Sequence, residues 1–166
     1  MRKFIIFMPV SVTMFSGCSS HFEHYILPST NANAANSYKN VRLLNSDNRS
    51  ETVLAAVYLN DVYPKYTDGF AHFLISFYNP QRDNVLYFDR SKTPSEEDYV
   101  LLLNDENALA SEALDNDDLL VELMPIRNSW NRYYYVRYRL PSEKLVLVLE
   151  SGHTARAEIT YQIDPE

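Results

Sequence analysis

The chain has 166 residues but a single cysteine, Cys18, and only three glycines. A lone cysteine cannot form a disulfide within the chain, and it leaves no second thiol for a metal site. The scarcity of glycine leaves few places for the glycine-rich loops that hold phosphate groups. These two shortages argue against a disulfide scaffold and against a phosphate-loop nucleotide site.

The short motifs that carry much of known enzyme chemistry are also missing. The chain contains no H-E-x-x-H, no G-x-S-x-G and no S-x-x-K. The acidic run DNDD at residues 115–118 lacks the glycine at its sixth position and the glutamate at its twelfth that a calcium loop requires. We therefore expect a protein that is not an enzyme and that has neither a metal nor a cofactor.

Four histidines are the remaining candidates for catalysis or metal binding. His21 and His24 form an H-x-x-H pair without a third ligand, which rarely holds a metal. His72 lies inside an apolar run and is expected to be a hydrogen-bonded core or edge residue, whereas His153 follows a turn glycine. The alternative is a hydrolase that pairs an Asp or Glu with His72 or His153.

No apolar run approaches the ~20 residues that a membrane-spanning helix needs. The run FIIFMPVSVTMF at residues 4–15 follows Arg2 and Lys3 and is succeeded by Ser16 and Gly17. A positive start, a short apolar stretch and small residues at its end are typical of an export signal.

The stretch Ser16-Gly17-Cys18 resembles the end of the signal peptides of bacterial lipoproteins, although Phe15 stands where leucine is usual. The resemblance implies cleavage before Cys18 and attachment of lipid to this cysteine, and several acyl chains give a durable anchor. Ser19 follows, and serine rather than aspartate there implies transfer to the outer membrane of a host with two membranes. The alternative is an ordinary secretory leader with an incidental thiol.

The chain is expected to consist of a signal peptide (1–17), a lipidated cysteine with a flexible tether (18–40) and one folded domain (41–166). The tether includes NANAANS, which shows no apolar periodicity. Without the leader the chain has thirteen basic and twenty-two acidic residues, a net charge of −9. Such acidity argues against a nucleic-acid partner, which requires a basic patch.

Short apolar runs separated by polar turns predict the fold of the domain. They lie at residues 51–59, 70–78, 84–88, 99–103, 119–126, 133–140, 144–150 and 155–163. The last three alternate between apolar and polar residues, which is typical of antiparallel strands with one buried face. We expect an all-β, antiparallel β-sandwich, immunoglobulin-like or transthyretin-like, with one short helix near 105–114, where the sequence is ENALASEAL.

Two aromatic clusters are candidate partner-binding surfaces. The first comprises Tyr133, Tyr135, Arg137 and Arg139, which alternation places opposite Tyr134, Val136, Tyr138 and Leu140, with Trp130 just before them. Tyr, Trp and Arg dominate binding hot spots, so this stripe is expected to face outward. The alternative is a second buried face whose arginines pair with acids. The second cluster contains Tyr63 and Tyr66, which are expected in an exposed loop.

Together these patterns favour a membrane-anchored lipoprotein that acts as a binding or structural adaptor for an envelope or secretion assembly. Its expected partners are the membrane, through Cys18, and a protein of the bacterial envelope. A lipid-anchored β-sandwich is similar in layout to secretion-system lipoproteins and pilotins. An immunity or inhibitor lipoprotein acting in the periplasm is the alternative, and a hydrolase ranks after it.

Overall fold

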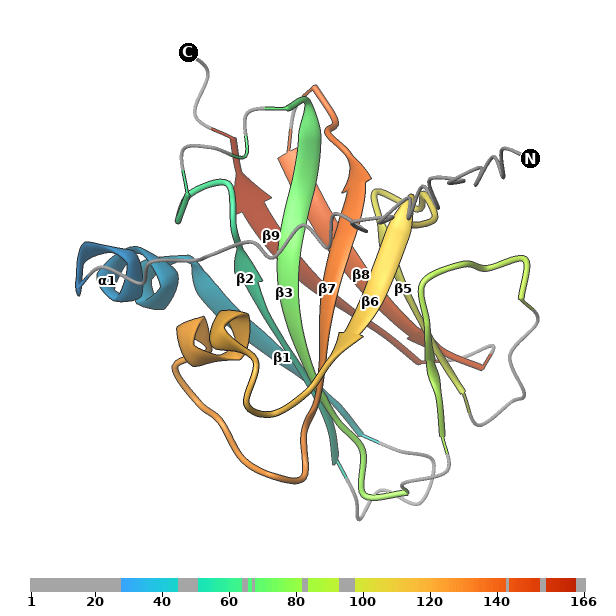
Figure 1. Ribbon diagram of the computed structural model, residues 1–166. Coiled ribbons are helices and arrows are strands. Elements are labelled where there is room, and N and C mark those ends of the chain that lie inside the picture. The colour runs from blue at the N-terminus through green and yellow to red at the C-terminus, as the bar shows by residue number, and fades with distance from the viewer. Residues whose placement is uncertain are drawn as a thin grey trace, which may run out of the picture.

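A computed structural model describes residues 28–44, 51–63, 66, 68–81, 84–92, 98–142, 144–152 and 155–163. These residues form two packed β-sheets (Figure 1), so the predicted all-β sandwich is confirmed. The five-stranded sheet has the order β1 (Tyr38–Leu44), β2 (Glu51–Tyr58), β3 (Phe70–Tyr78), β7 (Arg132–Arg139) and β6 (Ala110–Leu114). The four-stranded sheet has the order β4 (Leu86–Tyr87), β5 (Tyr99–Leu103), β8 (Lys144–Ser151) and β9 (Ala155–Gln162). All neighbouring strands are antiparallel except β4 and β5, which pair in parallel over two residues.

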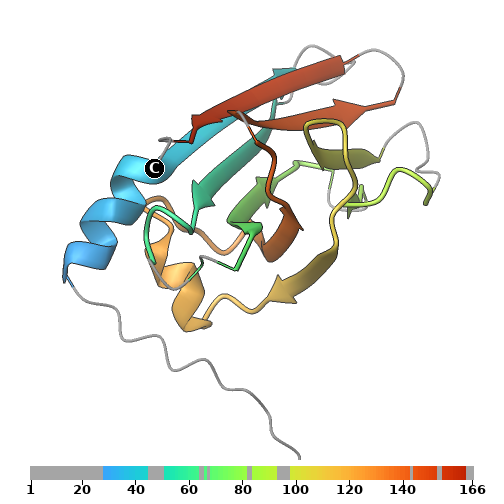
Figure 2. The ribbon, with the colours of Figure 1, turned by 90° about the horizontal axis from the view of Figure 1, so that it is seen from above.

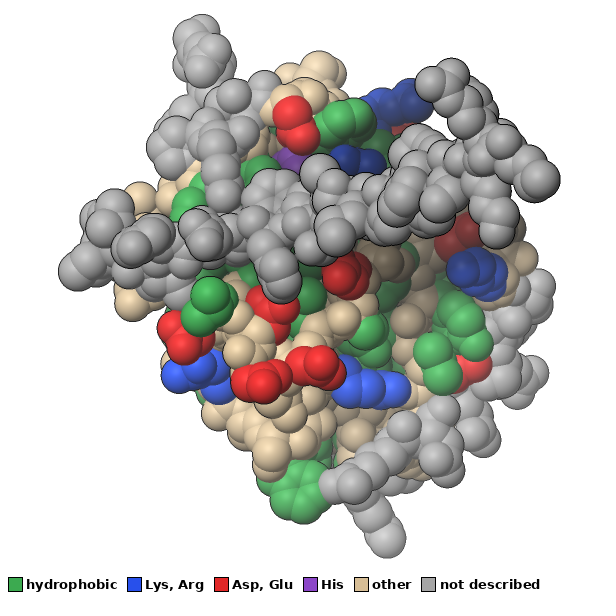
Figure 3. All heavy atoms as spheres, in the orientation of Figure 1, with side chains coloured by type: hydrophobic (Ala, Val, Ile, Leu, Met, Phe, Trp, Pro, Cys, Tyr) green, Lys and Arg blue, Asp and Glu red, His purple; other side chains and the backbone are tan. Residues whose placement is uncertain are grey.

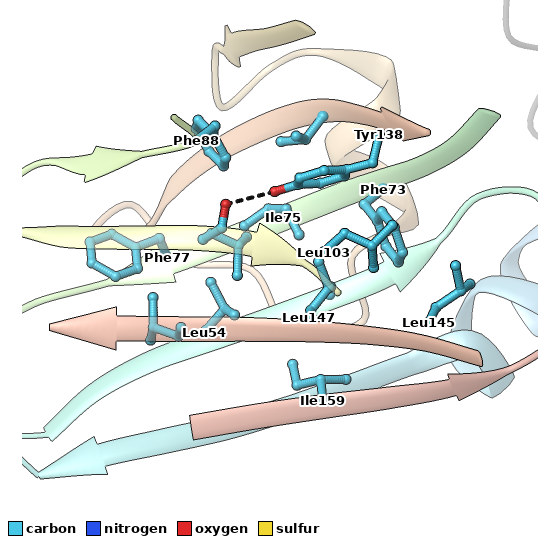
Figure 4. Packing of buried hydrophobic residues seen from close by; sticks show 14 of the residues in the cluster. Leu54, Phe73, Ile75, Phe77, Phe88, Leu103, Tyr138, Leu145, Leu147 and Ile159 are labelled. Atoms are coloured by element: carbon cyan, nitrogen blue, oxygen red, sulfur yellow. Dashed lines mark hydrogen bonds between the residues drawn. The ribbon is translucent and has the colours of Figure 1, made fainter. Parts of the chain in front are cut away.

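The main core lies between the two sheets and follows the predicted alternation (Figure 4). Val136 and Tyr138 enter it from β7, and Leu145 and Leu147 enter it from β8. The hydroxyl of Tyr138 donates to the backbone carbonyl of Leu101, at 2.9 Å, and so joins the two sheets inside the core.

A second core covers the outer face of the five-stranded sheet. Two short helices, α1 (Pro28–Ser37) and η1 (Leu119–Leu123), contribute to it, the second being a 3-10 helix. Its buried residues are Ala34, Ala55, Val57, Leu59, Val62, Tyr63, Tyr66, Leu74, Leu120, Val121, Leu123, Met124 and Tyr133. Because β2 and β3 have cores on both faces, their sequences are almost continuously apolar.

The prediction of a short helix near 105–114 is wrong, because Ala110–Leu114 is strand β6. Left-handed backbone at Asn104 and Asp105 (φ 49° and 64°) makes the turn before it. Backbone pairing with β7 overrides the helix-forming composition, since the nine residues of ENALASEAL are too few to form a stable helix without support. The strand expected at 119–126 is also wrong: η1 begins there, with the side chain of Asp118 accepting from the backbone N–H of Leu120 at 2.7 Å.

The expected tether also differs from the structure at its C-terminal end. Helix α1 occupies part of it, and β1, which begins at Tyr38, places the start of the sheet before the expected domain boundary at residue 41. Ser37, the last residue of α1, links the helix to β2. Its hydroxyl donates to the backbone carbonyl of Tyr58 and accepts from the backbone N–H of the same residue, both at 3.1 Å. The alanine-rich segment folds as a helix because Ala34 is fully buried against the sheet.

The sandwich is closed along one side. Lys39 of edge strand β1 donates to the backbone carbonyl of Thr160 in β9, at 2.6 Å, and its ammonium group lies over the ring of Tyr161. Figure 2, which views the molecule from above, shows β1 running beside the β8–β9 pair. The other two edge strands, β6 and β4, lie on the opposite side.

Candidate functional site: a groove on the outer face of the five-stranded sheet

A groove of about 520 Å³ lies on the outer face of the five-stranded sheet. Its lining residues are Tyr38, Asn40, Arg42, Val53, Ala55, Ser76, Tyr78, Ile126, Asn128, Trp130 and Asn131. The strand residues share this face because the register pairs Asn40 with Ala55 and Ala55 with Ser76. The small side chains of Ala55 and Ser76 lower the floor at its centre, so the sheet itself is hollowed here.

The segment between η1 and β7 forms one wall of the groove and is held by its own hydrogen bonds. The side-chain oxygen of Asn128 accepts from the backbone N–H groups of Trp130 and Asn131, at 2.9 and 3.0 Å. The side-chain amide of Asn131 donates to the hydroxyl of Ser76 in the floor, at 2.7 Å. The buried Tyr133 donates its hydroxyl to the Asn128 carbonyl, at 3.2 Å. This wall is therefore fixed in place before any partner binds.

Large hydrophobic side chains of this wall remain exposed to solvent. Trp130 is 62% exposed and Ile126 is 60% exposed. By contrast, the phenylalanines of the main core, such as Phe73 and Phe77, are fully buried. An exposed tryptophan beside tyrosines and amides is the composition of a binding hot spot.

The groove carries little charge. Burial raises the pKa of the Tyr38 hydroxyl, so this phenol is neutral at physiological pH. Arg42, at the rim, pairs with the carboxylate of Glu51 at 3.1 Å. Within the described ranges, no three His, Cys, Asp or Glu side chains lie close enough together to hold a metal ion. The groove is suited to a partner that offers both apolar and uncharged polar groups.

The stripe on β7 lies on the predicted face but is not a continuous exposed surface. Tyr133 is 2% exposed and belongs to the second core. Tyr135 and Arg137 are half-buried, and Arg139 is exposed. The register of the alternation was correct, because Val136 and Tyr138 fill the main core. The expected exposure was wrong at Tyr133, because the chain around η1 covers that end of the face.

Tyr63 and Tyr66 were expected in an exposed loop, and this expectation is wrong. They are 9% and 8% exposed, and both belong to the second core. The ring of Tyr66 stacks on the imidazole of His72, with centroids 4.3 Å apart. Burial raises the pKa of each of the two hydroxyl groups.

His72 lies at the centre of a hydrogen-bonded cluster. Its Nδ1 contacts the hydroxyl of Tyr135 at 2.6 Å, and its Nε2 contacts a carboxylate oxygen of Asp68 at 2.8 Å. Its side chain is 3% exposed, which confirms the expectation of a hydrogen-bonded core or edge histidine. The hydrogen bond from His72 lowers the pKa of Asp68, and burial raises the pKa of Tyr135.

The cluster joins a carboxylate, an imidazole and a phenol in series. A catalytic histidine needs one ring nitrogen directed at a nucleophile or at the substrate. The Nδ1 of His72 faces the hydroxyl of Tyr135, which burial keeps a neutral phenol, and the His72 side chain is only 3% exposed. His153, the other histidine considered for hydrolysis, lies outside the described residues, as does Cys18.

The sequence analysis missed most of the groove. Tyr38 and Asn40 fell within the expected tether, and Ile126 and Asn128 were not singled out. The one available signal was Trp130, the only tryptophan of the chain, in a polar segment between apolar runs.

Comparison with known proteins produces no match: no family model, no curated protein and no solved structure matches the chain. In the part of the chain that the structure covers, no helix has the length and apolar character needed to cross a membrane.

Proposed function

We propose that this chain is a lipid-anchored protein of the bacterial envelope that binds a partner protein in the groove around Trp130. In this proposal it acts as an adaptor for an envelope or secretion assembly and is not an enzyme. The lipid anchor at Cys18 and the outer-membrane location rest on the resemblance of the leader to lipoprotein signal peptides. The binding role rests on one observation, the preformed groove with an exposed tryptophan at its wall.

The chemistry of the groove supports a protein partner. Trp and Tyr are enriched at the centres of protein interfaces, where they lose water and contribute most of the binding energy. The rings of Tyr38, Tyr78 and Trp130 supply such anchors, and the neighbouring asparagines supply hydrogen-bonding groups. Because hydrogen bonds already hold the wall, binding costs little ordering entropy.

The proposal is tested with Trp130→Ala in the full-length, lipidated protein. Removing a hot-spot tryptophan commonly costs about 2 kcal/mol or more, which corresponds to a loss of affinity of about thirty-fold. We expect the partner that co-purifies with the wild-type protein from solubilised envelopes to be lost from this variant. Thermal unfolding should be nearly unchanged, because the side chain is largely exposed.

Leu119→Ala is the matched control. Leu119 is also exposed, at 51%, but it does not line the groove. This variant should retain the partner. Retention of the partner by Trp130→Ala, or an equal loss from both variants, would contradict the assignment of the groove as the binding surface.

A further inference from the structure

Strand β6 forms one edge of the five-stranded sheet and, among the described residues, pairs only with β7. Its residues from Ala110 to Ala113 are exposed, and Leu114 is half-buried. In an antiparallel ladder, every second residue of an edge strand directs its N–H and C=O groups away from its neighbour. The free side of β6 therefore presents a row of backbone donors and acceptors.

Among the described residues, this edge has only part of the usual protection against pairing with another strand: β6 is short and carries one charge, Glu112. Edge strands are commonly protected by being short, by charged side chains and especially lysine, by proline, by a bulge or by a covering element. The sequence of β6, ASEAL, has neither lysine nor proline. At the opposite edge of the same sheet, β1 carries Lys39, which binds β9 and closes that side. The two edges thus differ in a way that leaves β6 ready to accept a strand.

A hollow of about 420 Å³ lies directly beside this edge, between β6 and residues 86–92. The rings of Phe88 and Tyr134 line it, edge to face, with centroids 5.2 Å apart. Its wall is held by two hydrogen bonds of 2.8 Å: Ala108 N–H donates to the Phe88 carbonyl, and Arg90 N–H donates to the Asn107 side chain. Leu109, 49% exposed, also lines it. The hollow is therefore preformed beside the backbone edge of β6, and its lining combines these two rings with the charged side chains of Asp89 and Lys92.

The charge around β6 is mostly acidic, although Lys92 lines the hollow and Arg137 lies opposite Ala110 on β7. Glu112 lies in the middle of the strand, and Asp115, Asp117 and Asp118 follow it directly. Figure 3 shows acidic side chains gathered on this face between η1 and the end of β6. A segment that binds here gains from basic residues at its ends.

We propose that β6 is a strand-addition site for an extended, basic segment of a partner protein. The segment pairs with the free backbone groups of β6 and places alternate apolar side chains against Phe88 and Tyr134. Backbone hydrogen bonds supply affinity in this mode of recognition, and the side-chain hollow supplies selectivity. This surface is separate from the groove at Trp130, and a second binding surface is what an adaptor requires.

A second copy of this chain is a poorer occupant. Antiparallel pairing of two β6 strands about a two-fold axis at their midpoint places Glu112 of one copy opposite Glu112 of the other, and the acidic run of each copy near Glu106 of the other. Like charges opposite each other destabilise a strand pair, and each chain has a net charge of −7. The acidic surroundings therefore favour a basic partner over self-association.

The test uses the chain from residue 19 onward, which retains every residue that the structure describes. The probe is the synthetic peptide KKVTISVTKK, with KKVTPSVTKK as a control that cannot form a continuous strand. We expect saturable binding of the first peptide below about 1 mM and at least tenfold weaker binding of the second. Backbone amide shifts should be largest at residues 108–114 and 86–92. No saturable binding, or the largest shifts elsewhere, would overturn the proposal.

Two lysine variants separate strand addition from simple charge attraction. Ala113→Lys inserts a long cationic side chain into the hollow, whereas Leu119→Lys adds the same charge away from it. We expect the first to weaken peptide binding at least tenfold and the second to leave it within about twofold. Equal effects of the two variants would overturn the proposal. If circular dichroism shows that the Ala113→Lys variant does not fold, the proposal is judged from the positions of the largest amide shifts that the first peptide causes in the wild-type chain.

Two further measurements distinguish the other occupants. Trp130→Ala should leave peptide affinity unchanged, and a loss would mean that the peptide occupies the groove at Trp130 instead. Sedimentation should show a monomer in the absence of peptide. A dimer that Ala113→Lys dissociates would assign this edge to a second copy and overturn the proposal. Whether the groove at Trp130 binds a partner is tested separately, by co-purification of that partner with the Trp130→Ala variant.

Discussion

Replacing Tyr138 by phenylalanine tests whether a single hydroxyl group stabilises the packing of the two sheets. Tyr138 is fully buried on β7, and its hydroxyl donates to the carbonyl of Leu101 on β5, at 2.9 Å. Phenylalanine keeps the ring and its edge-on contact with Phe73, so the substitution opens no large cavity. The loss is the hydrogen bond itself, which contributes about 1 kcal/mol net and up to about 3 kcal/mol where a buried partner is left unsatisfied.

We therefore expect Tyr138→Phe to lower the free energy of unfolding by about 1–2 kcal/mol, measured by urea denaturation at neutral pH. Tyr134→Phe is the matched control, because Tyr134 is a half-buried residue of the same strand. Among the described residues its hydroxyl has no hydrogen-bond partner, so its loss should change stability by less than about 0.5 kcal/mol. The slope of free energy against urea should be the same for the wild type and both variants. A neutral effect of Tyr138→Phe, or an equal effect of both changes, would refute the reasoning.

Two further predictions concern alkaline pH and the lipid anchor. Burial raises the pKa of Tyr58 to about 12 and raises those of Tyr138 and Tyr161 further, whereas unfolded tyrosines ionise near pH 10. The stabilising contribution of these neutral phenols is complete below about pH 10 and is lost as the pH rises from there through about 12. The urea concentration at the midpoint of unfolding should therefore fall over this range, while tyrosinate absorbance appears. A midpoint that stays constant would contradict this prediction. Cys18→Ala should release the protein from the membrane fraction and remove the mass of the acyl chains, and the lipid anchor is disproved if both versions remain with membranes at the mass of an unmodified chain.

Local patterns accounted for most of the strands. The runs at residues 70–78 and 99–103 coincide with β3 and β5 at both ends. Alternation also placed Tyr138 and Val136 in the core, because successive side chains of a strand point to opposite faces whatever lies around them. These features depend on a few neighbouring residues, and a single sequence is enough to show them.

The sequence pattern could not show that other segments cover the outer face of the five-stranded sheet. Tyr133 and Tyr66 are buried because α1, η1 and residues 59–66 fold over the five-stranded sheet. Strand periodicity identifies two faces, but it does not say whether a distant segment covers the second one. For the same reason β6, with its helix-forming composition, became a strand only through pairing with β7.

The groove could not be predicted from the sequence either, because tertiary structure brings its residues together. The groove exists because Ala55 on β2 and Ser76 on β3, distant in the chain, meet as small neighbours in the floor, while Asn131 holds the wall that carries Trp130. The sequence by itself determined the acidic charge and the β-sandwich, since composition and short-range periodicity suffice for these, and the proposed leader rests on the sequence alone. Only the folded chain decided which side chains remain in water, because exposure depends on contacts between segments far apart in sequence.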